Sequence, residues 1–196
     1  MTAGADLAAY GLLHADALRV LSALEPADEQ QELLLLDMLA HLREHPDALA
    51  KAGPPAHFTA SAVVLDADLT HVLLTHHLKA GQWYQLGGHL EPVDRSVRAG
   101  AEREALEEGG ITGLMVTPTP VHLDRHYLVG SFGRCEQHLD LRYAALAPGG
   151  ATPVVSDESH DVRWWPVDAL PEGTAAELGR PVELGLRAVS ALARPV

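Results

Sequence analysis

The sequence predicts an α+β protein with two additional helices at its N-terminus. Three observations carry this prediction: Ala- and Leu-rich helical periodicity over the first fifty residues, β-branched apolar runs after residue 56, and one acidic helix between the strands. Strands that surround a helix and are followed by a closing helix are typical of an α+β or layered α/β/α domain.

The N-terminal segment 1–52 is predicted to form a helical hairpin. Apolar residues recur at helical spacing over residues 6–24 and again over 29–45, and a proline follows the second run. The Gly-Pro-Pro segment 53–55 marks a boundary. We therefore divide the chain into a hairpin, 1–52, and a main domain, 53–196. The leucine-rich faces of the hairpin predict either packing on the main domain or a homodimer interface.

The main domain alternates strands with a few helices. Strands are expected at 57–66, 71–78, 113–123, 125–130, 137–147 and 160–165. A glycine turn is expected at Gly87-Gly88, followed by a helix over 96–108 that Gly109-Gly110 would cap. An amphipathic helix over 183–193 is expected to close the chain.

Composition excludes several classes of protein. The 196 residues carry a formal net charge of −13, which disfavours nucleic acid and anionic membrane as partners. Cys135 is the single cysteine, so no internal disulfide can form, and we interpret it as an ordinary thiol. The N-terminus does not resemble a signal peptide, and no apolar run is long enough to span a membrane. We expect a cytoplasmic protein.

The acidic helix is the strongest functional signal. Glu104, Glu107 and Glu108 are three or four residues apart and share one helix face. Like charges at this spacing are mildly destabilising, but their oxygens are the hard ligands that Mg²⁺ or Mn²⁺ prefers. An acidic run alone is more often a solvated helix face, so the flanking sequence decides.

The flanking sequence resembles the Nudix box, G-x5-E-x7-R-E-U-x-E-E-x-G-U, in which U is aliphatic. Gly88 matches the first glycine, and the run from Arg103 to Ile111 matches the second half without a gap. Asp94 replaces the first glutamate, and eight residues rather than seven separate it from Arg103. The resemblance extends over about residues 57–170, through features such as Trp83 and the segment after the last strand.

Membership of the Nudix family implies an α/β/α sandwich with a mixed sheet, and hydrolysis of a diphosphate linkage. The expected substrate is a small-molecule phosphoanhydride, such as a nucleoside diphosphate derivative. The resemblance implies that Mg²⁺ or Mn²⁺ is held by Glu104 and Glu108, often with Glu107, and by the main-chain carbonyl of Gly88. It implies that Arg103 orients the glutamates.

Hydrolysis also needs a group that accepts a proton from the attacking water. Glu108 is our first candidate for this base, and Glu158, in a loop after the long strand, is the second. Glu107 and Arg103 complete the predicted catalytic set. An ordinary exposed acid is the alternative interpretation of Glu158.

Four further residues are predicted to contact substrate. His89 follows the box glycine directly, while His138, Asp140 and Arg142 share one face of a predicted strand. Arg142 suits a phosphate oxygen because a guanidinium binds oxyanions with two donors. A solvated strand face is the alternative interpretation.

Two competing functions remain. A catalytically silent Nudix domain that senses a nucleotide or binds a protein is the main alternative, although such domains commonly lose box acids that are present here. His41 and His45 have the H-x-x-E-H spacing of a zinc peptidase group, but no further ligand is evident. The remaining histidines show no second ligand pattern.

Overall fold

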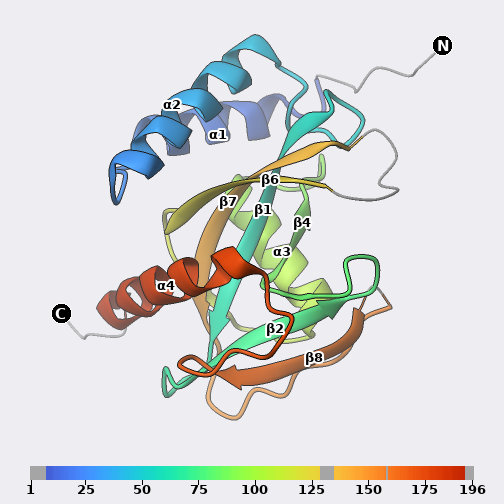
Figure 1. Cartoon of the computed structure of the whole chain (residues 1–196). Helices are drawn as coiled ribbons and strands as arrows, with labels where there is room; N and C mark the ends of the chain where they lie inside the picture. Colours follow the sequence, from blue (N-terminus) through green and yellow to red (C-terminus); the bar gives the residue numbers. More distant parts are fainter. Residues whose placement is uncertain (1–7, 129–134, 158, 193–196) are drawn as a thin grey trace.

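The computed structural model describes residues 8–128, 135–157 and 159–192, which form a curved sheet with helices on both faces (Figure 1). The helices are α1 (Gly11–Ser22), α2 (Glu29–Glu44), α3 (Val97–Gly109) and α4 (Gly179–Leu192), with a short 3-10 helix η1 (Ala176–Leu178) before α4. The strands are β1 (Ala56–Leu65), β2 (His71–His77), β3 (Trp83–Tyr84), β4 (Leu86–His89), β5 (Met115–Val116), β6 (His122–Tyr127), β7 (Gln137–Leu146) and β8 (Ser159–Pro166). The predicted α+β class and the N-terminal helical pair are confirmed.

The long strand β1 organises the sheet. It pairs in parallel with β7 along its whole length, from Ala56 opposite Gln137 to Leu65 opposite Leu146. On its other side β4 and β2 pair with it antiparallel, one after the other. The remaining strands are antiparallel, β5 and β6 on β7, and β3 and β8 on β2. The sheet is therefore mixed, as the family resemblance implies.

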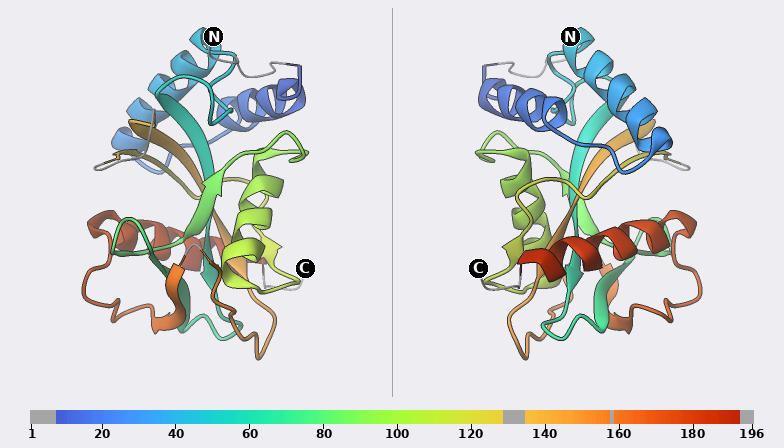
Figure 2. Two further views of the ribbon diagram at one scale, coloured as in Figure 1. Left: turned by 90° about the vertical axis from the view of Figure 1, so that its right-hand side faces the viewer. Right: turned by 90° about the vertical axis from the view of Figure 1, so that its left-hand side faces the viewer.

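Alternation along β1 divides the protein into two cores. Phe58, Ala60 and Ala62 face a large apolar cluster shared with α1, α2 and α3, whereas Val63 and Leu65 face a smaller cluster shared with α4. Figure 2 shows α3 and α4 on opposite sides of the sheet. Buried apolar side chains at alternating positions thus fix which face each helix covers.

The N-terminal helices pack on the rest of the molecule. Leu13 and Leu21 of α1 and Met38 and Leu42 of α2 are at most 1% exposed and belong to the same apolar cluster as α3. This is one of the two arrangements that we expected. The division into a hairpin and a main domain stays a prediction, as does a homodimer.

The expected turn at Gly87-Gly88 is wrong, because both glycines lie inside strand β4. They pair with Ser61 and Ala60 of β1. A Cβ on Gly87 would lie 2.3 Å from the Cβ of Ser61, so glycine is needed here for close approach rather than for a turn.

Two other boundaries differ from the sequence prediction. A strand over 113–123 is wrong, since only Met115–Val116 is extended and paired before Pro118 and Pro120, which cannot donate to a ladder. The next strand begins at His122. The closing helix begins at Gly179, earlier than expected, and includes Pro181 in its first turn, where a missing N–H costs nothing. No helix in the described part of the chain is long and apolar enough to cross a membrane.

Candidate active site

Both ends of helix α3 are fixed by side chains or by glycine. Ser96 Oγ accepts a hydrogen bond from the Ala99 N–H at 3.1 Å, which satisfies one of the first-turn donors. Asp16 Oδ2 of α1 accepts from the Val97 N–H at 2.9 Å. At the other end Gly110 adopts a left-handed conformation with φ of 69° and its N–H bonds back into the helix. The helix that carries the acids is therefore anchored partly by the N-terminal segment.

Arg103 joins the acidic groups into one network. Its Nε and Nη2 donate to the two oxygens of Asp94, each at 2.9 Å. Its Nη1 donates to Glu104 Oε1 at 2.9 Å and to Glu107 Oε2 at 3.0 Å. The hydrogen bond to Asp94, together with the neighbouring carboxylates, holds the pKa of Arg103 above its usual range. A permanently charged, bidentate guanidinium thus fixes the position of two box glutamates.

Asp94 lies beside this arginine. Its carboxylate is almost fully buried and also accepts the Glu91 N–H at 2.8 Å, which closes the loop before α3. The longer loop compensates for a side chain one methylene shorter than glutamate. Gly100 makes this packing feasible, because a Cβ there would lie 2.4 Å from Leu90 Cδ2 and 3.1 Å from Asp94 Oδ2.

Strand β4 lies close to the acidic face of α3. A Cβ on Gly88 would lie 2.6 Å from Glu104 Oε2, and the Gly87 N–H donates to Glu108 Oε2 at 2.8 Å. Glu108 is only 5% exposed, whereas the side chain of Glu107 is 58% exposed. Carboxylate oxygens and a glycine backbone meet here, and this oxygen-rich donor set fits Mg²⁺ or Mn²⁺. Glu158, our second candidate for the base, lies outside the described residues.

A second polar network lies on the opposite face of the sheet, around Asp140. Its carboxylate accepts hydrogen bonds from Ser61 Oγ at 2.6 Å, Thr59 Oγ1 at 3.1 Å and Arg142 Nε at 3.2 Å. Arg142 is 1% exposed, and its Nη2 donates to Asp124 Oδ2 at 2.9 Å. Its Nη1 is buried and makes no hydrogen bond to any described residue. Sequence reasoning named Asp140 and Arg142 but missed their partners.

The sequence does indicate the two hydroxyl partners of Asp140, Thr59 and Ser61. Thr59 and Ser61 are polar residues two apart in an otherwise apolar stretch, so they share one strand face. Such a pair within a buried strand indicates a buried polar partner, because an unpaired hydroxyl would cost about 1 to 3 kcal/mol.

His89 and His138 lie on the same face, and His57 packs against both. His57 Nε2 and His89 Nε2 are 3.1 Å apart, and the ring centroids of His57 and His138 are 5.1 Å apart. Burial lowers the pKa of His57, that of His89 to about 4 and that of His138 to about 3. These imidazoles are uncharged at neutral pH and offer hydrogen bonds or lone pairs rather than positive charge.

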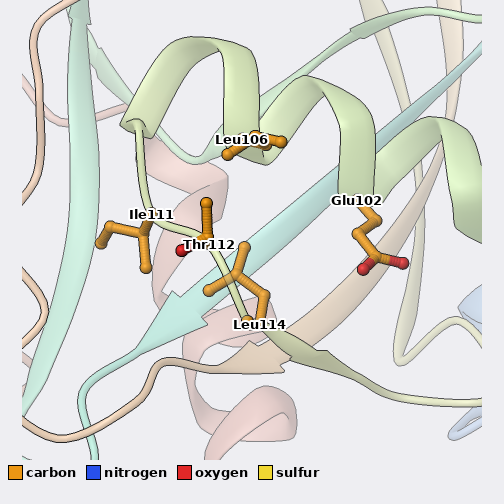
Figure 3. A pocket seen from close by; sticks show the side chains of 6 residues that line it. Glu102, Leu106, Ile111, Thr112 and Leu114 are labelled. Carbon is orange, nitrogen blue, oxygen red and sulfur yellow. The ribbon is translucent and has the colours of Figure 1, made fainter.

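A small hollow at the C-terminal end of α3 does not include the box acids. Figure 3 shows its lining, which comprises Glu102, Leu106, Ile111, Thr112, Gly113 and Leu114. Its volume is about 80 Å³. Ligand sites for small molecules are usually several times larger, on the order of 300 Å³ or more. We do not assign it to substrate.

The comparison with known protein families identifies the same family as the box sequence. A model of the NUDIX domain family matches residues 55–184. Among curated proteins, no sequence matches the chain.

Solved structures share the fold. A NUDIX family hydrolase from Clostridium perfringens superposes with a TM-score of 0.53 at 23% identity, covering 69% of this chain and 97% of that one. An Ap4A hydrolase from C. elegans gives 0.51 at 21% identity, covering 69% and 96%. A dihydroneopterin triphosphate pyrophosphohydrolase from E. coli gives 0.54 at 16% identity, again covering 69% and 96%.

The family model spans well over half of the chain and includes every box position. The chain therefore belongs to the NUDIX domain family, and we class it with the Nudix hydrolases.

Proposed function

We propose that this protein is a metal-dependent pyrophosphohydrolase that cleaves a diphosphate linkage in a nucleoside diphosphate derivative or related phosphoanhydride. The observation that carries the proposal is the set of three box glutamates gathered beside Gly87-Gly88, where Arg103 binds Glu104 and Glu107 and the Gly87 N–H binds Glu108. A domain used only for sensing would have no need to keep Glu104, Glu107 and Glu108 together, since like charges on one helix face are destabilising.

The donor set suits a hard divalent cation. Glu104, Glu107, Glu108 and the Gly88 carbonyl would hold Mg²⁺ or Mn²⁺. When bound, such an ion neutralises phosphoryl oxygens and makes a water more acidic. Arg103 contributes by orientation, because its guanidinium is already occupied by Asp94 and two glutamates.

Glu108 is our first candidate for the base that takes a proton from the attacking water. It is the most buried of the three box glutamates, and the Gly87 N–H holds one of its oxygens in place. A carboxylate held in this way needs little reorganisation when it accepts a proton. Glu158 stays the second candidate.

We propose that a part of the substrate other than the scissile diphosphate contacts the polar face of β7, because this face of the sheet is opposite the box acids. The buried Arg142 retains one donor, Nη1, without a hydrogen bond to any described residue, which suits a substrate oxygen. Asp140 would fix the orientation of Arg142, and the neutral His89 and His138 would contribute hydrogen bonds. The E. coli and C. elegans proteins share only the fold, so their named substrates do not decide which phosphoanhydride is used here.

The test is a panel of nucleoside di- and triphosphates, nucleotide sugars, ADP-ribose and dinucleotide polyphosphates, with Mg²⁺ or Mn²⁺. Phosphate release is measured, after phosphatase treatment where needed. We expect turnover of at least one compound, and a loss of about 10²-fold or more in Glu108→Gln. Glu102→Gln is the matched control, because Glu102 is an exposed glutamate on the same helix that lines the small hollow instead.

Equal turnover by wild type and Glu108→Gln on the best compound would remove Glu108 from the catalytic set. No turnover of any compound, together with tight binding of one nucleotide, would replace the enzyme proposal by the sensor function.

A further inference from the structure

Four side chains capable of binding a transition metal meet on the sheet face opposite the Nudix box. His57, His89, Cys135 and His138 each place one ligand atom within 4.8 Å of every other. None of these residues has an oxygen donor, and the box uses oxygen donors only. The two groups of residues therefore suit different ions.

Three neighbouring strands bring these residues together. His57 of β1 is directly opposite His138 of β7, and His89 of β4 is opposite Thr59, two residues along β1. Cys135 comes two residues before β7. Its position is fixed because the backbone N–H groups of Glu136 and Gln137, which follow it, both donate to Pro55 O, at 3.0 and 3.2 Å.

A ring nitrogen of each imidazole points into the group. His57 Nδ1 lies 3.1 Å from Pro54 O, which can only accept, so Nδ1 carries the hydrogen and Nε2 carries the lone pair. That Nε2 faces His89 Nε2 at 3.1 Å. His138 Nε2 is buried and has no hydrogen-bond partner among the described residues. A buried nitrogen of this kind needs a partner, and a cation among the four side chains would supply one.

We propose that His57, His89, Cys135 and His138 form a tetrahedral site for Zn²⁺, separate from the Mg²⁺ or Mn²⁺ site of the box. Imidazole nitrogen and thiolate sulfur are both zinc ligands, and four protein ligands close the coordination shell. Two nitrogens bound to one zinc ion lie about 3.3 Å apart, close to the His57–His89 distance. The site is structural in type, since it leaves no position for a reacting water. Zinc bound to His89 and His138 would take the place of the hydrogen bonds to substrate proposed for these two imidazoles.

The site would also support the catalytic face. His89 follows Gly88, so alternation along β4 directs its side chain away from Glu104. The carbonyl of His89 accepts a hydrogen bond from Arg103 Nη2 at 2.9 Å. Zinc bound on one face would thus fix the strand that positions the box arginine on the other, as surrounding partners do for metal ligands.

The test uses the untagged full chain, freed of metal with a chelator and then titrated with Zn²⁺ or Co²⁺ in excess Mg²⁺. We expect one equivalent to bind, and the cobalt form to show a thiolate-to-cobalt charge-transfer band with the intense visible absorption of tetrahedral coordination. Because Cys135 is the single cysteine, the thiolate band reports this residue alone.

Variants distinguish this site from the box and from surface histidines. Cys135→Ser should abolish the thiolate band, and Cys135→Ser and His138→Gln should each weaken Zn²⁺ binding by more than about tenfold. Glu108→Gln and His160→Gln, an exposed histidine, should bind Zn²⁺ as wild type does. The proposal is overturned if the cobalt form lacks the thiolate band, or if Cys135→Ser retains full affinity while Glu108→Gln loses it.

Discussion

The pair of Asp94 and Arg103 explains how a variant box keeps its geometry. The carboxylate is shorter than the glutamate of the family pattern, yet both of its oxygens reach the guanidinium because the loop is one residue longer. Its buried position makes the pair sensitive, since an unpaired buried charge is costly.

Asp94→Asn tests this pairing. The substitution preserves size but removes the charge that holds Arg103, so Glu104 and Glu107 lose their fixed positions. We expect Mn²⁺ affinity, measured by calorimetry, to fall about 10- to 100-fold. Asp68→Asn, at an exposed acid, is the control and should change nothing. An unchanged affinity in Asp94→Asn would show that Arg103 is oriented without it.

His122 gives a prediction on pH. Burial lowers its pKa from the ordinary value of 6.5, and the charge of Arg142 lowers it further. The unfolded chain therefore takes up a proton near pH 6.5 that the folded chain takes up only at lower pH. The stability contributed by neutral His122 is present above pH 6.5 and is lost as pH falls below it.

Urea unfolding at several pH values below 6.5 measures this effect. The free energy of unfolding should fall less steeply with decreasing pH in His122→Gln than in wild type, whereas His160→Gln should follow wild type. Identical slopes for wild type and His122→Gln would contradict the assignment.

At the scale of elements, the packing of helix α3 explains why Gly100, a poor helix former, lies within it. Gly100 costs about 1 kcal/mol relative to alanine in an unconstrained helix. Here its missing side chain lets the loop carrying Leu90 and Asp94 pack against the helix.

Gly100→Ala should therefore destabilise the protein by about 1 to 3 kcal/mol, despite the gain in helix propensity. Chemical denaturation provides the measurement. Gly179→Ala is the matched control, because a Cβ there meets nothing within 4 Å and should be neutral or stabilising. A stabilised Gly100→Ala would mean that the loop adapts without cost.

The elements also show what periodicity can and cannot predict. Helix α2 and strands β1, β2 and β7 end within about two residues of the prediction, because each has a long apolar pattern. Helix α3 does so because Gly109-Gly110 marks its end. Strand β4 was missed because its two glycines are typical of a turn, whereas their real constraint, close contact with Ser61 and Glu104, is tertiary.

The box glutamates were predicted as a group because they lie within one helix. The histidine and cysteine group was not, because strand pairing brings its distant members together.

At the scale of the whole molecule, the N-terminal helices hold α3 and strand β6 in place. Asp16 binds the first turn of α3, and Gln31 of α2 binds both backbone groups of Leu123 in strand β6, accepting at 2.7 Å and donating at 2.9 Å. The Gln31 side chain thus hydrogen-bonds strand β6 along the edge that faces away from β7.

Gln31→Leu should destabilise the protein by about 2 to 4 kcal/mol, because the N–H and C=O of Leu123 would be left buried and unpaired. The exposed neighbour provides the control, and Gln30→Leu should differ little from wild type. Thermal or urea unfolding compares the two. Equal stability of both variants would show that solvent reaches this edge and that α2 contributes apolar packing alone.

The central claim is that the acids of α3 form a metal-dependent phosphoanhydride centre. Its most direct test is the initial rate of cleavage of the best substrate as a function of Mn²⁺ concentration, for wild type, Glu104→Gln and Glu102→Gln. We predict that Glu104→Gln needs far more Mn²⁺ and is slower by about 10²-fold or more at saturation, whereas Glu102→Gln matches wild type. A Glu104→Gln curve that coincides with that of wild type, or a wild-type rate that is independent of the metal, would contradict the claim.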